Sequence, residues 1–316
     1  MGALIDGRWT TNLDEIKNGA YERKPTSFRQ KISNDPGSRY EAEPGRYHLY
    51  VSLACPWASR TLMLRKLKKL EDVISVTVVH PDMMENGWTF GDTPEPVNGF
   101  RFLHELYTAA LPTYSGHATV PVLWDRKTAT IVNNESAEII RMMNSAFDAW
   151  GDASVNLYPE TLAHEIDLLN DTIYETVNNG VYRAGFAKSQ AAYEEAVRGI
   201  FTILEELEAR LSRQRYLLGD TFTEADVRLF TTAVRFDLVY YSHFKCNLKH
   251  WWDYPNLENW LRDVYQTSSI SETVDLDQIK RHYYYSQRWV NPSGIIPTGP
   301  SIDLRKAHDR NRFVRS

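Results

Sequence analysis

Hydrophobic and polar positions change their period along the N-terminal half of the chain. From Tyr47 to Val51 they alternate in steps of two, which predicts a strand. From Pro56 to Leu70 leucines recur at helical spacing, behind a proline that suits the first position of a helix. The apolar run 73–79 predicts a second strand. Strand, helix and strand in this order form a βαβ unit, whose strands are parallel and joined by a right-handed crossover.

Glycines and prolines interrupt residues 80–119, which we therefore expect to form a long loop. A loop of this length is uncommon unless it has a function. Two short strands follow at 119–125 and 130–132, and then a helix from Glu135 to Met143. The order β-α-β-loop-β-β-α is that of a thioredoxin-like α/β domain. In this fold the proline before the third strand, here Pro121, is typically cis.

The second half of the chain has a helical period. Apolar residues recur every three or four positions over 162–177 and 193–211, which predicts amphipathic helices. Thr223 and Asp226 form a capping box before a helix that is apolar on more than one side, so we expect that helix to be central. Shorter helices are expected at 255–266 and 271–283.

These patterns predict the domain organisation. We expect an irregular N-terminal arm at 1–46, a thioredoxin-like domain at 47–150, an all-α domain at 151–290 and a C-terminal tail at 291–316. The tail is rich in proline and glycine and ends in basic residues, which we interpret as the solvated charges of a surface segment: Arg305, Lys306, Arg310, Arg312 and Arg315.

Composition narrows the classes of function. The 316 residues carry a formal charge of −5, which argues against nucleic acid as a general partner. We see no apolar run that would span a membrane and no signal peptide, and two cysteines cannot form a disulfide framework, so a cytoplasmic protein is expected. The surroundings of Cys55, Cys246 and the histidines lack metal-ligand spacing, so we expect no metal.

Cys55 is the strongest candidate for a reactive group. It stands directly before the predicted helix, whose N-terminus stabilises a thiolate, the nucleophilic form of cysteine. A buried structural cysteine is the alternative, but a Cys-Pro pair between a strand and a helix favours the reactive interpretation. Ala58 occupies the position where a dithiol redox motif has its second cysteine. The chemistry at Cys55 would therefore be monothiol, and an external thiol, usually glutathione, would complete the cycle.

Three further positions suggest a ligand with an extended backbone. A cis Pro121 would turn the backbone of Val120 outward beside Cys55, where it would pair with an extended peptide. The free N–H groups near Ser136 favour a carboxylate, and Glu135 would hold an ammonium, as a γ-glutamyl group requires. The commoner alternative is a helix cap, made by Asn134 or Ser136 with acids in the first turn. Trp88, in the long loop, is either a hydrophobic anchor or a ligand contact.

A thioredoxin-like domain followed by an all-helical domain is the architecture of glutathione transferases. Local motifs narrow the resemblance to the glutathionyl-hydroquinone reductases, also called the xi class, over nearly the whole chain. The motifs are C-P-W-A (55–58), N-G-W-T-F (86–90), V-P-V-L-W-D (120–125), N-N-E-S-A-E-I-I-R-M (133–142), N-N-G-V-Y-R-A-G-F (178–186), R-F-D-L-V-Y (235–240), H-F-K-C-N (243–247), R-H-Y-Y-Y-S (281–286) and N-P-S-G-I-I-P-T-G-P (291–300).

The resemblance implies roles for the candidate residues on the glutathione side. Cys55 matches the catalytic cysteine. Glu135 and Ser136 match the residues that hold the γ-glutamyl end of glutathione. Val120 matches the residue whose backbone pairs with the cysteinyl part, and Trp88 matches a tryptophan that packs over glutathione. One departure is His117, which stands where the family often has an arginine that contacts glutathione.

The resemblance also implies a hydroquinone site and a homodimer. Tyr182, Tyr240 and Tyr283 match the tyrosines that bind the hydroquinone, although from the residues alone such tyrosines are more often part of a core. Tyr283 is followed by Tyr284 and Tyr285, so the register of this third position is open.

The implied activity is the glutathione-dependent reduction of glutathionyl-hydroquinones. A mixed disulfide between Cys55 and glutathione would form and be resolved by a second glutathione, which releases oxidised glutathione. The alternatives are a conventional glutathione-conjugating transferase and a general thiol transferase. A non-catalytic scaffold and a cysteine protease-like use of Cys55 are weaker, because the thiol and the glutathione motifs are retained and no motif places a histidine.

Overall fold

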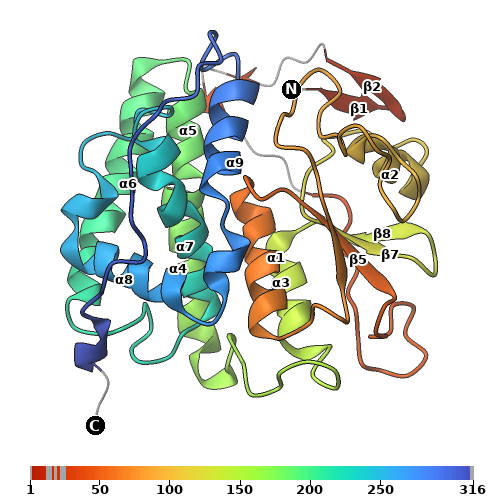
Figure 1. The fold of residues 1–316 in the computed structure, drawn as a ribbon, viewed down its shortest axis with the longest axis horizontal. Helices are drawn as coiled ribbons and strands as arrows, with labels where there is room; N and C mark the ends of the chain where they lie inside the picture. The colour runs from red at the N-terminus through yellow and green to blue at the C-terminus, as the bar shows by residue number, and fades with distance from the viewer. Residues whose placement is uncertain (1, 12–15, 18–19, 22–25, 314–316) are drawn as a thin grey trace. The chain divides into compact units, whose positions relative to one another are not determined.

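The structure is a computed structural model that describes residues 2–11, 16–17, 20–21 and 26–313 (Figure 1). Its described residues form two compact units. The first unit contains residues 2–11, 26–155 and 277–282. The second unit contains residues 16–17, 20–21, 156–276 and 283–313.

A four-stranded mixed sheet forms the core of the first unit. Its strands are β5 (Tyr47–Val51), β6 (Ser75–Val78), β7 (Val122–Asp125) and β8 (Thr130–Asn133). The order is β6-β5-β7-β8; β5 pairs in parallel with β6 and antiparallel with β7. Leu49, in the middle of β5, is opposite Val76 on one side and Leu123 on the other. The predicted thioredoxin-like topology is confirmed.

Helices cover this sheet. Helix α1 (Pro56–Leu67) and helix α3 (Ser136–Ser145) pack against each other. In Figure 1 they lie on one side of the sheet, and α2 (Leu103–Ala110) lies on the other. The expectation that residues 80–119 form a loop throughout is wrong at α2. The helix is short, so its buried positions repeat too few times to show a helical period. The glycines and prolines on both sides of it favour a loop interpretation instead.

The N-terminal arm was expected to be irregular, but it contains short antiparallel ladders. Strand β1 (Ala3–Ile5) pairs with β2 (Arg8–Thr10), and β3 (Ile16–Lys17) pairs with β4 (Ala20–Tyr21). The first hairpin turns at Asp6-Gly7, where φ is 46° and 76°. An Asp-Gly pair is a strong hairpin signal because both central residues of such a turn need a positive φ. The sequence therefore carried a signal for this turn.

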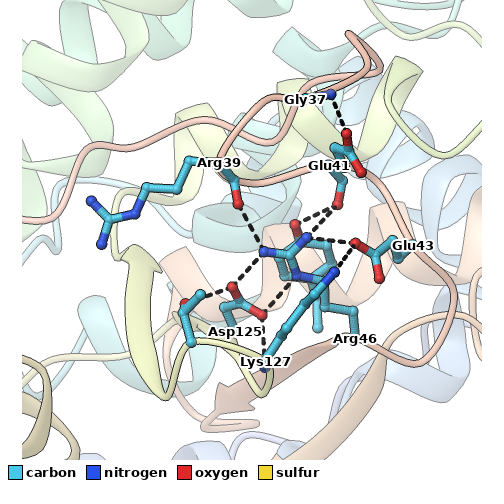
Figure 2. Close-up of polar contacts among 9 residues, drawn as sticks. Gly37, Arg39, Glu41, Glu43, Arg46, Asp125 and Lys127 are labelled. Carbon is cyan, nitrogen blue, oxygen red and sulfur yellow. Dashed lines mark hydrogen bonds and ion pairs between the residues drawn. The ribbon is translucent and has the colours of Figure 1, made fainter.

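A charged cluster fixes residues 37–46 to the end of the sheet (Figure 2). The Arg46 guanidinium donates to both carboxylate oxygens of Asp125, at 2.8 and 2.7 Å, and to the carbonyl of Arg39. Glu43 accepts from Arg46 at 2.7 Å and from Lys127 at 3.0 Å. Burial raises the pKa of Asp125, but hydrogen bonds from Arg46 and Thr128 outweigh it, so the net pKa is lowered. The carboxylate is therefore ionised and paired.

The second unit is built mainly from helices. They are α4 (Ala163–Ile173), α5 (Gly180–Phe186), α6 (Gln190–Leu211), α7 (Glu224–Arg235) and α8 (Pro255–Gln266), with 3-10 turns η1 (Glu160–Leu162), η4 (Trp251–Asp253), η5 (Ile270–Thr273) and η7 (Arg310–Phe313). Every residue of α7 is buried, which confirms its predicted central position. The predicted capping box is also present, since Asp226 accepts from the N–H of Thr223 at 3.0 Å. Helix α9 (Leu276–Arg281) leads into the second unit's last segment.

Three π-helical turns interrupt the helices in the described part of the chain. They are η2 (Tyr174–Asn178) between α4 and α5, η3 (Phe236–Tyr240) after α7, and η6 (His282–Ser286) after α9. Such wide turns are rare and occur often at functional sites. The sequence periodicity did not predict them.

The C-terminal tail differs from its prediction at one residue. Arg310 is completely buried and donates from one nitrogen to the carbonyls of Leu211, Gln214 and Arg215. Leu211 is the last residue of α6, where a cation is favourable, and the other two carbonyls belong to the turn that follows the helix. The interpretation of all the tail charges as solvated is therefore wrong for Arg310, which anchors the tail. Arg315 lies outside the described residues.

No helix in the described part of the chain combines the length and the apolarity that crossing a membrane requires.

Candidate active site

Cys55 lies at the N-terminal end of α1, as the sequence predicts. It is the N-cap residue in an extended conformation, with φ −80° and ψ 121°, and Pro56 occupies the first helical turn. The carbonyl of Cys55 accepts from the N–H of Ser59 at 3.0 Å, which starts the helix. The Cys55 residue is partly exposed and its sulfur is a free thiol. A partly exposed thiol at the positive end of a helix has the setting of a nucleophile.

The backbone of Val120 lies beside this thiol. The Val120-Pro121 peptide bond is cis, which confirms the prediction. The Sγ of Cys55 donates to the carbonyl of Val120 at 3.6 Å. Residues 65 positions apart in the sequence are therefore brought together, and a backbone carbonyl stands next to the candidate nucleophile.

Glu135 begins α3 and caps it. Its Oε1 accepts from the N–H of Ala137 at 3.1 Å, and the hydroxyl of Ser136 lies 3.4 Å from the same oxygen. The alternative that the sequence left open, a helix cap, is therefore present, but the capping residue is Glu135 and not Asn134 or Ser136. Asn134 is engaged elsewhere, because its amide donates to Tyr107 and its carbonyl oxygen accepts from the N–H of Phe28. A carboxylate and a hydroxyl thus stand together at a helix N-terminus.

Arg60 links the two helix N-termini, and the sequence analysis did not identify it. It lies on α1, is almost completely buried and donates to the Ser136 hydroxyl at 3.4 Å. The signal that was available is a charged residue within a helix whose other early residues are small or apolar. The contact places the start of α3 against the first turns of α1, and so brings Ser136 toward the helix that begins at Cys55.

Trp88 is buried within the first unit. Only 8% of the residue is exposed, and its ring stacks on the imidazole of His282, with centroids 4.6 Å apart and an interplanar angle of 18°. His282 also lies 2.9 Å from the carbonyl of Pro81, and Arg281 forms a two-pronged ion pair with Asp82 at 2.6 and 2.7 Å. The anchoring role that the sequence left open is therefore present. The stacking partner is too distant in sequence for a local motif to reveal it.

The three candidate tyrosines meet in the second unit. The hydroxyls of Tyr182 and Tyr283 lie 2.5 Å apart, and those of Tyr240 and Tyr283 lie 3.0 Å apart. Tyr240 and Tyr283 are buried, whereas Tyr182 is partly exposed. Burial raises the pKa of Tyr283 well above its usual range, so its hydroxyl keeps its proton at neutral pH. Tyr283 therefore presents a neutral hydroxyl that donates and accepts hydrogen bonds.

All three π-helical turns adjoin this cluster. Tyr240 ends η3, Tyr283 lies within η6, and Tyr182 follows η2 by one turn of α5. The three consecutive tyrosines have different contacts: Tyr283 pairs with Tyr182 and Tyr240, Tyr284 pairs with the Ser242 hydroxyl, and Arg288 lies over the ring of Tyr285. Tyr283 is thus the residue of the triplet that joins the cluster.

Two residues singled out by the sequence have other surroundings. His117 lies 3.1 Å from the carbonyl of Gly2, at the start of the N-terminal hairpin. Cys246 is completely buried, and burial raises the pKa of its thiol, so it remains a thiol. Complete burial is typical of a structural cysteine.

The matches to known proteins follow the two predicted halves of the chain. Residues 54–146 match the glutathione S-transferase N-terminal domain, and residues 190–263 match the C-terminal domain. The chain is 53% identical to glutathionyl-hydroquinone reductase YqjG of Escherichia coli over 98% of this chain and 99% of the relative. It is 49% identical to glutathionyl-hydroquinone reductase PcpF of Sphingobium chlorophenolicum over 96% and 98%. The chain belongs to the glutathionyl-hydroquinone reductase family.

Solved structures agree with this assignment. The glutathione-bound structure of the Escherichia coli relative superposes with a TM-score of 0.90 at 52% identity, covering 98% of this chain and 99% of that one. The xi-class glutathione transferase of Natrialba magadii gives a TM-score of 0.93 at 48% identity, covering 99% and 97%. The family resemblance and the glutathione transferase fold predicted from the sequence are therefore confirmed. Because the chain belongs to this family, the candidate residues can be interpreted together, as candidates for one glutathione-dependent reaction.

Proposed function

We propose that this protein reduces glutathionyl-hydroquinones to hydroquinones, with glutathione as co-substrate. The observation that carries the proposal is the Cys55 thiol at the N-terminus of α1, 3.6 Å from the carbonyl of Val120. A glutathione-conjugating transferase needs a hydroxyl to activate glutathione, whereas a cysteine in this position attacks a sulfur. The two relatives named above, at 53% and 49% identity, are glutathionyl-hydroquinone reductases.

The reaction consists of two nucleophilic attacks on sulfur, of which the second is a thiol–disulfide exchange. The Cys55 thiolate attacks the glutathione sulfur that is bonded to the aromatic ring, and an S–S bond forms. The C–S bond breaks, its electron pair goes to the ring carbon, and that carbon takes up a proton. The thiolate of a second glutathione then attacks the glutathione sulfur of the mixed disulfide, and Cys55 leaves as a thiolate. Oxidised glutathione and the hydroquinone are the products, so the ring is reduced and glutathione is oxidised.

The N-terminal unit supplies the proposed glutathione contacts. The Glu135 carboxylate binds the ammonium of the γ-glutamyl group, and Ser136 with the first N–H groups of α3 binds its carboxylate. The Val120 backbone pairs with the cysteinyl residue of glutathione, which places its sulfur beside Cys55. Trp88 packs over glutathione while its ring rests on His282.

The tyrosine cluster supplies the proposed hydroquinone contacts. Hydroxyl groups match the ring oxygens of a hydroquinone as donors and acceptors. Tyr182 contacts the ring directly, because it is the least buried of the three tyrosines. Tyr283 orients Tyr182 through the hydrogen bond at 2.5 Å, and Tyr240 in turn holds the Tyr283 hydroxyl at 3.0 Å.

A single-turnover experiment tests the proposal. Wild type, mixed with a glutathionyl-hydroquinone, is expected to release the hydroquinone and to gain the mass of one glutathione on Cys55. Cys55→Ala is expected to lose at least about 1,000-fold in rate, because its nucleophile is absent, while it still binds glutathione. The measurements are chromatography of the released hydroquinone and intact mass of the protein.

Cys246→Ala is the matched control, because it removes the other, buried thiol and is expected to keep the glutathione adduct. A fully active Cys55→Ala variant would contradict the mechanism. Conjugation of glutathione to a simple electrophile, without hydroquinone release, would instead support the conjugating transferase.

Assembly and location complete the proposal. We infer a homodimer, for which light scattering would give twice the chain mass of 36.6 kDa. We also infer a cytoplasmic location, which agrees with two free thiols and is tested by cell fractionation.

A further inference from the structure

One buried hydroxyl connects the two segments that carry the proposed glutathione contacts. Tyr107, on α2, is completely buried. Its hydroxyl donates to the carbonyl of Thr119 at 2.8 Å and accepts from the N–H of the same residue at 3.1 Å. It also accepts from the side-chain amide of Asn134 at 3.1 Å. One donor and two lone pairs are all used, so the hydroxyl is fully engaged.

The partners of this hydroxyl are each one residue from a proposed contact. Thr119 directly precedes Val120, whose carbonyl lies 3.6 Å from the Cys55 sulfur. Asn134 directly precedes Glu135, the capping residue of α3. The two segments are 15 positions apart and flank the open end of the β7–β8 hairpin, where Leu123 pairs with Asn133. Thr119 and Asn134 lie beyond this last pair, so the Tyr107 hydroxyl joins them where the strand pairing has ended.

We propose that Tyr107 is a positioning residue for glutathione, which fixes the Val120 backbone relative to the Glu135 carboxylate. The inference rests on the proposed function, in which glutathione binds both segments at once. A ligand that spans two contacts loses affinity when one contact shifts against the other. Without the hydroxyl, the Thr119 backbone and the Asn134 amide lose buried hydrogen bonds and move to find other partners.

The ring of Tyr107 is held independently of its hydroxyl. It packs edge-on against Phe28, with centroids 5.8 Å apart, and at a tilt of 49° against Tyr114, with centroids 5.0 Å apart. A Tyr107→Phe variant therefore keeps the ring and removes only the hydroxyl. Burial raises the pKa of Tyr107 to about 12, so the hydroxyl keeps its proton throughout the working range of pH.

Tyr47 provides a matched control within the same unit. It is also completely buried, and its hydroxyl donates to the carbonyl of Glu41 at 2.6 Å. Glu41 is one of the residues labelled in Figure 2. Tyr47→Phe thus removes a buried tyrosine hydroxyl that joins no proposed glutathione contact. Both variants are expected to lose a few degrees in Tm, because each loses buried hydrogen bonds.

The test compares the dissociation constant of glutathione, measured by titration calorimetry, for wild type, Tyr107→Phe and Tyr47→Phe. Tyr107→Phe is expected to weaken binding about 5- to 20-fold, and Tyr47→Phe less than about twofold. Glu135→Gln is then added to each background. Because Tyr107 acts through Glu135, Glu135→Gln is expected to weaken binding less in Tyr107→Phe than in wild type.

Each result has a definite meaning. Unchanged glutathione binding in Tyr107→Phe overturns the inference. Equal weakening in Tyr107→Phe and Tyr47→Phe also overturns it, because general destabilisation then explains both. A reductase that stays active as Cys55→Ala refutes the proposed reaction but leaves the binding comparison valid. A wild type that does not bind glutathione refutes both, so the two failures are distinguishable.

Discussion

The two units of this protein present polar groups in different ways. The first unit offers a thiol, a backbone carbonyl and a carboxylate at turns and helix N-termini, as at Cys55, Val120 and Glu135. The second unit offers side-chain hydroxyls from three separate helices, at Tyr182, Tyr240 and Tyr283. The first arrangement depends on short local segments. The second depends on how long helices pack, so it responds more to changes in the interior of its unit.

The largest effect is expected where that packing depends on a single carboxylate. Asp226 is completely buried and accepts from the N–H groups of Leu217 and Thr223 at 3.0 Å and from the indole of Trp260 at 2.9 Å. Burial raises the pKa of Asp226 to about 6, so it is ionised at pH 8. Asp226→Ala leaves these buried donors without an acceptor, and we expect the free energy of unfolding to fall by about 3–5 kcal/mol.

Urea denaturation at pH 8 measures this loss, followed by tryptophan fluorescence. Asp171→Ala is the control, because Asp171 is an exposed carboxylate on α4, and it is expected to change the stability by less than about 0.5 kcal/mol. A similar stability of Asp226→Ala and wild type would mean that the helical unit does not depend on this cap.

The next prediction separates the functions of the two regions. Tyr283→Phe removes the hydroxyl that both Tyr182 and Tyr240 approach. We expect kcat/KM for a glutathionyl-hydroquinone to fall about 5- to 30-fold, because buried hydrogen bonds that orient Tyr182 are lost. The dissociation constant of glutathione is expected to stay within about twofold, because the altered hydroxyl pairs within the second unit.

Tyr285→Phe is the matched control for this variant, since Tyr285 is two residues away and lies against Arg288. It is expected to keep wild-type kinetics. A larger loss of kcat/KM in Tyr285→Phe than in Tyr283→Phe would show that Tyr285, and not Tyr283, is the member of the triplet that the reaction needs.

The same contrast explains which features were predictable. Cys55 before a proline and Val120 before a cis proline are local patterns, and the structure places both where the sequence predicted. The fold class followed from the order of strands and helices, because each has its own period. For the tyrosines, the residues alone favoured a core role, and only the family resemblance indicated a site.

Features that depend on distant partners were missed. Helix α2 was missed because it is too short to show a helical period. The sequence did contain its cap, Glu105, which accepts from the N–H groups of Arg101 and Phe102. Arg310 was taken for a solvated charge, because sequence does not show that the open carbonyls at the end of α6 lie beside it. The stack of Trp88 on His282 joins residues from distant segments in the same way. Local patterns fix turns and caps, whereas these contacts arise only from tertiary packing.

The smallest expected effect compares one buried histidine from each unit. His48, on β5, lies between the hydroxyls of Ser75 and Thr77, at 2.7 and 2.9 Å, and burial lowers its pKa to about 4. His243, in the second unit, lies 3.0 Å from the Gln287 side chain, and burial likewise lowers its pKa to about 4. Both are therefore neutral in the folded protein at pH 5, whereas in the unfolded chain a histidine with a pKa near 6.5 is protonated.

Between pH 6.5 and 4 the unfolded chain binds more protons than the folded protein at these two residues, so the free energy of unfolding falls as the pH falls. From pH 7 to pH 5 each histidine is expected to contribute about 1–2 kcal/mol to this loss. Urea midpoints at both pH values, for wild type, His48→Gln and His243→Gln, measure it, and each variant is expected to lose less stability than wild type. His164→Gln, at an exposed position on α4, is expected to follow wild type.

If only one of the two buried-site variants departs from wild type, the acid sensitivity that these histidines cause belongs to that unit alone. If neither departs, the acid sensitivity of both units arises from other groups, and the two interiors are alike in tolerating a protonated imidazole.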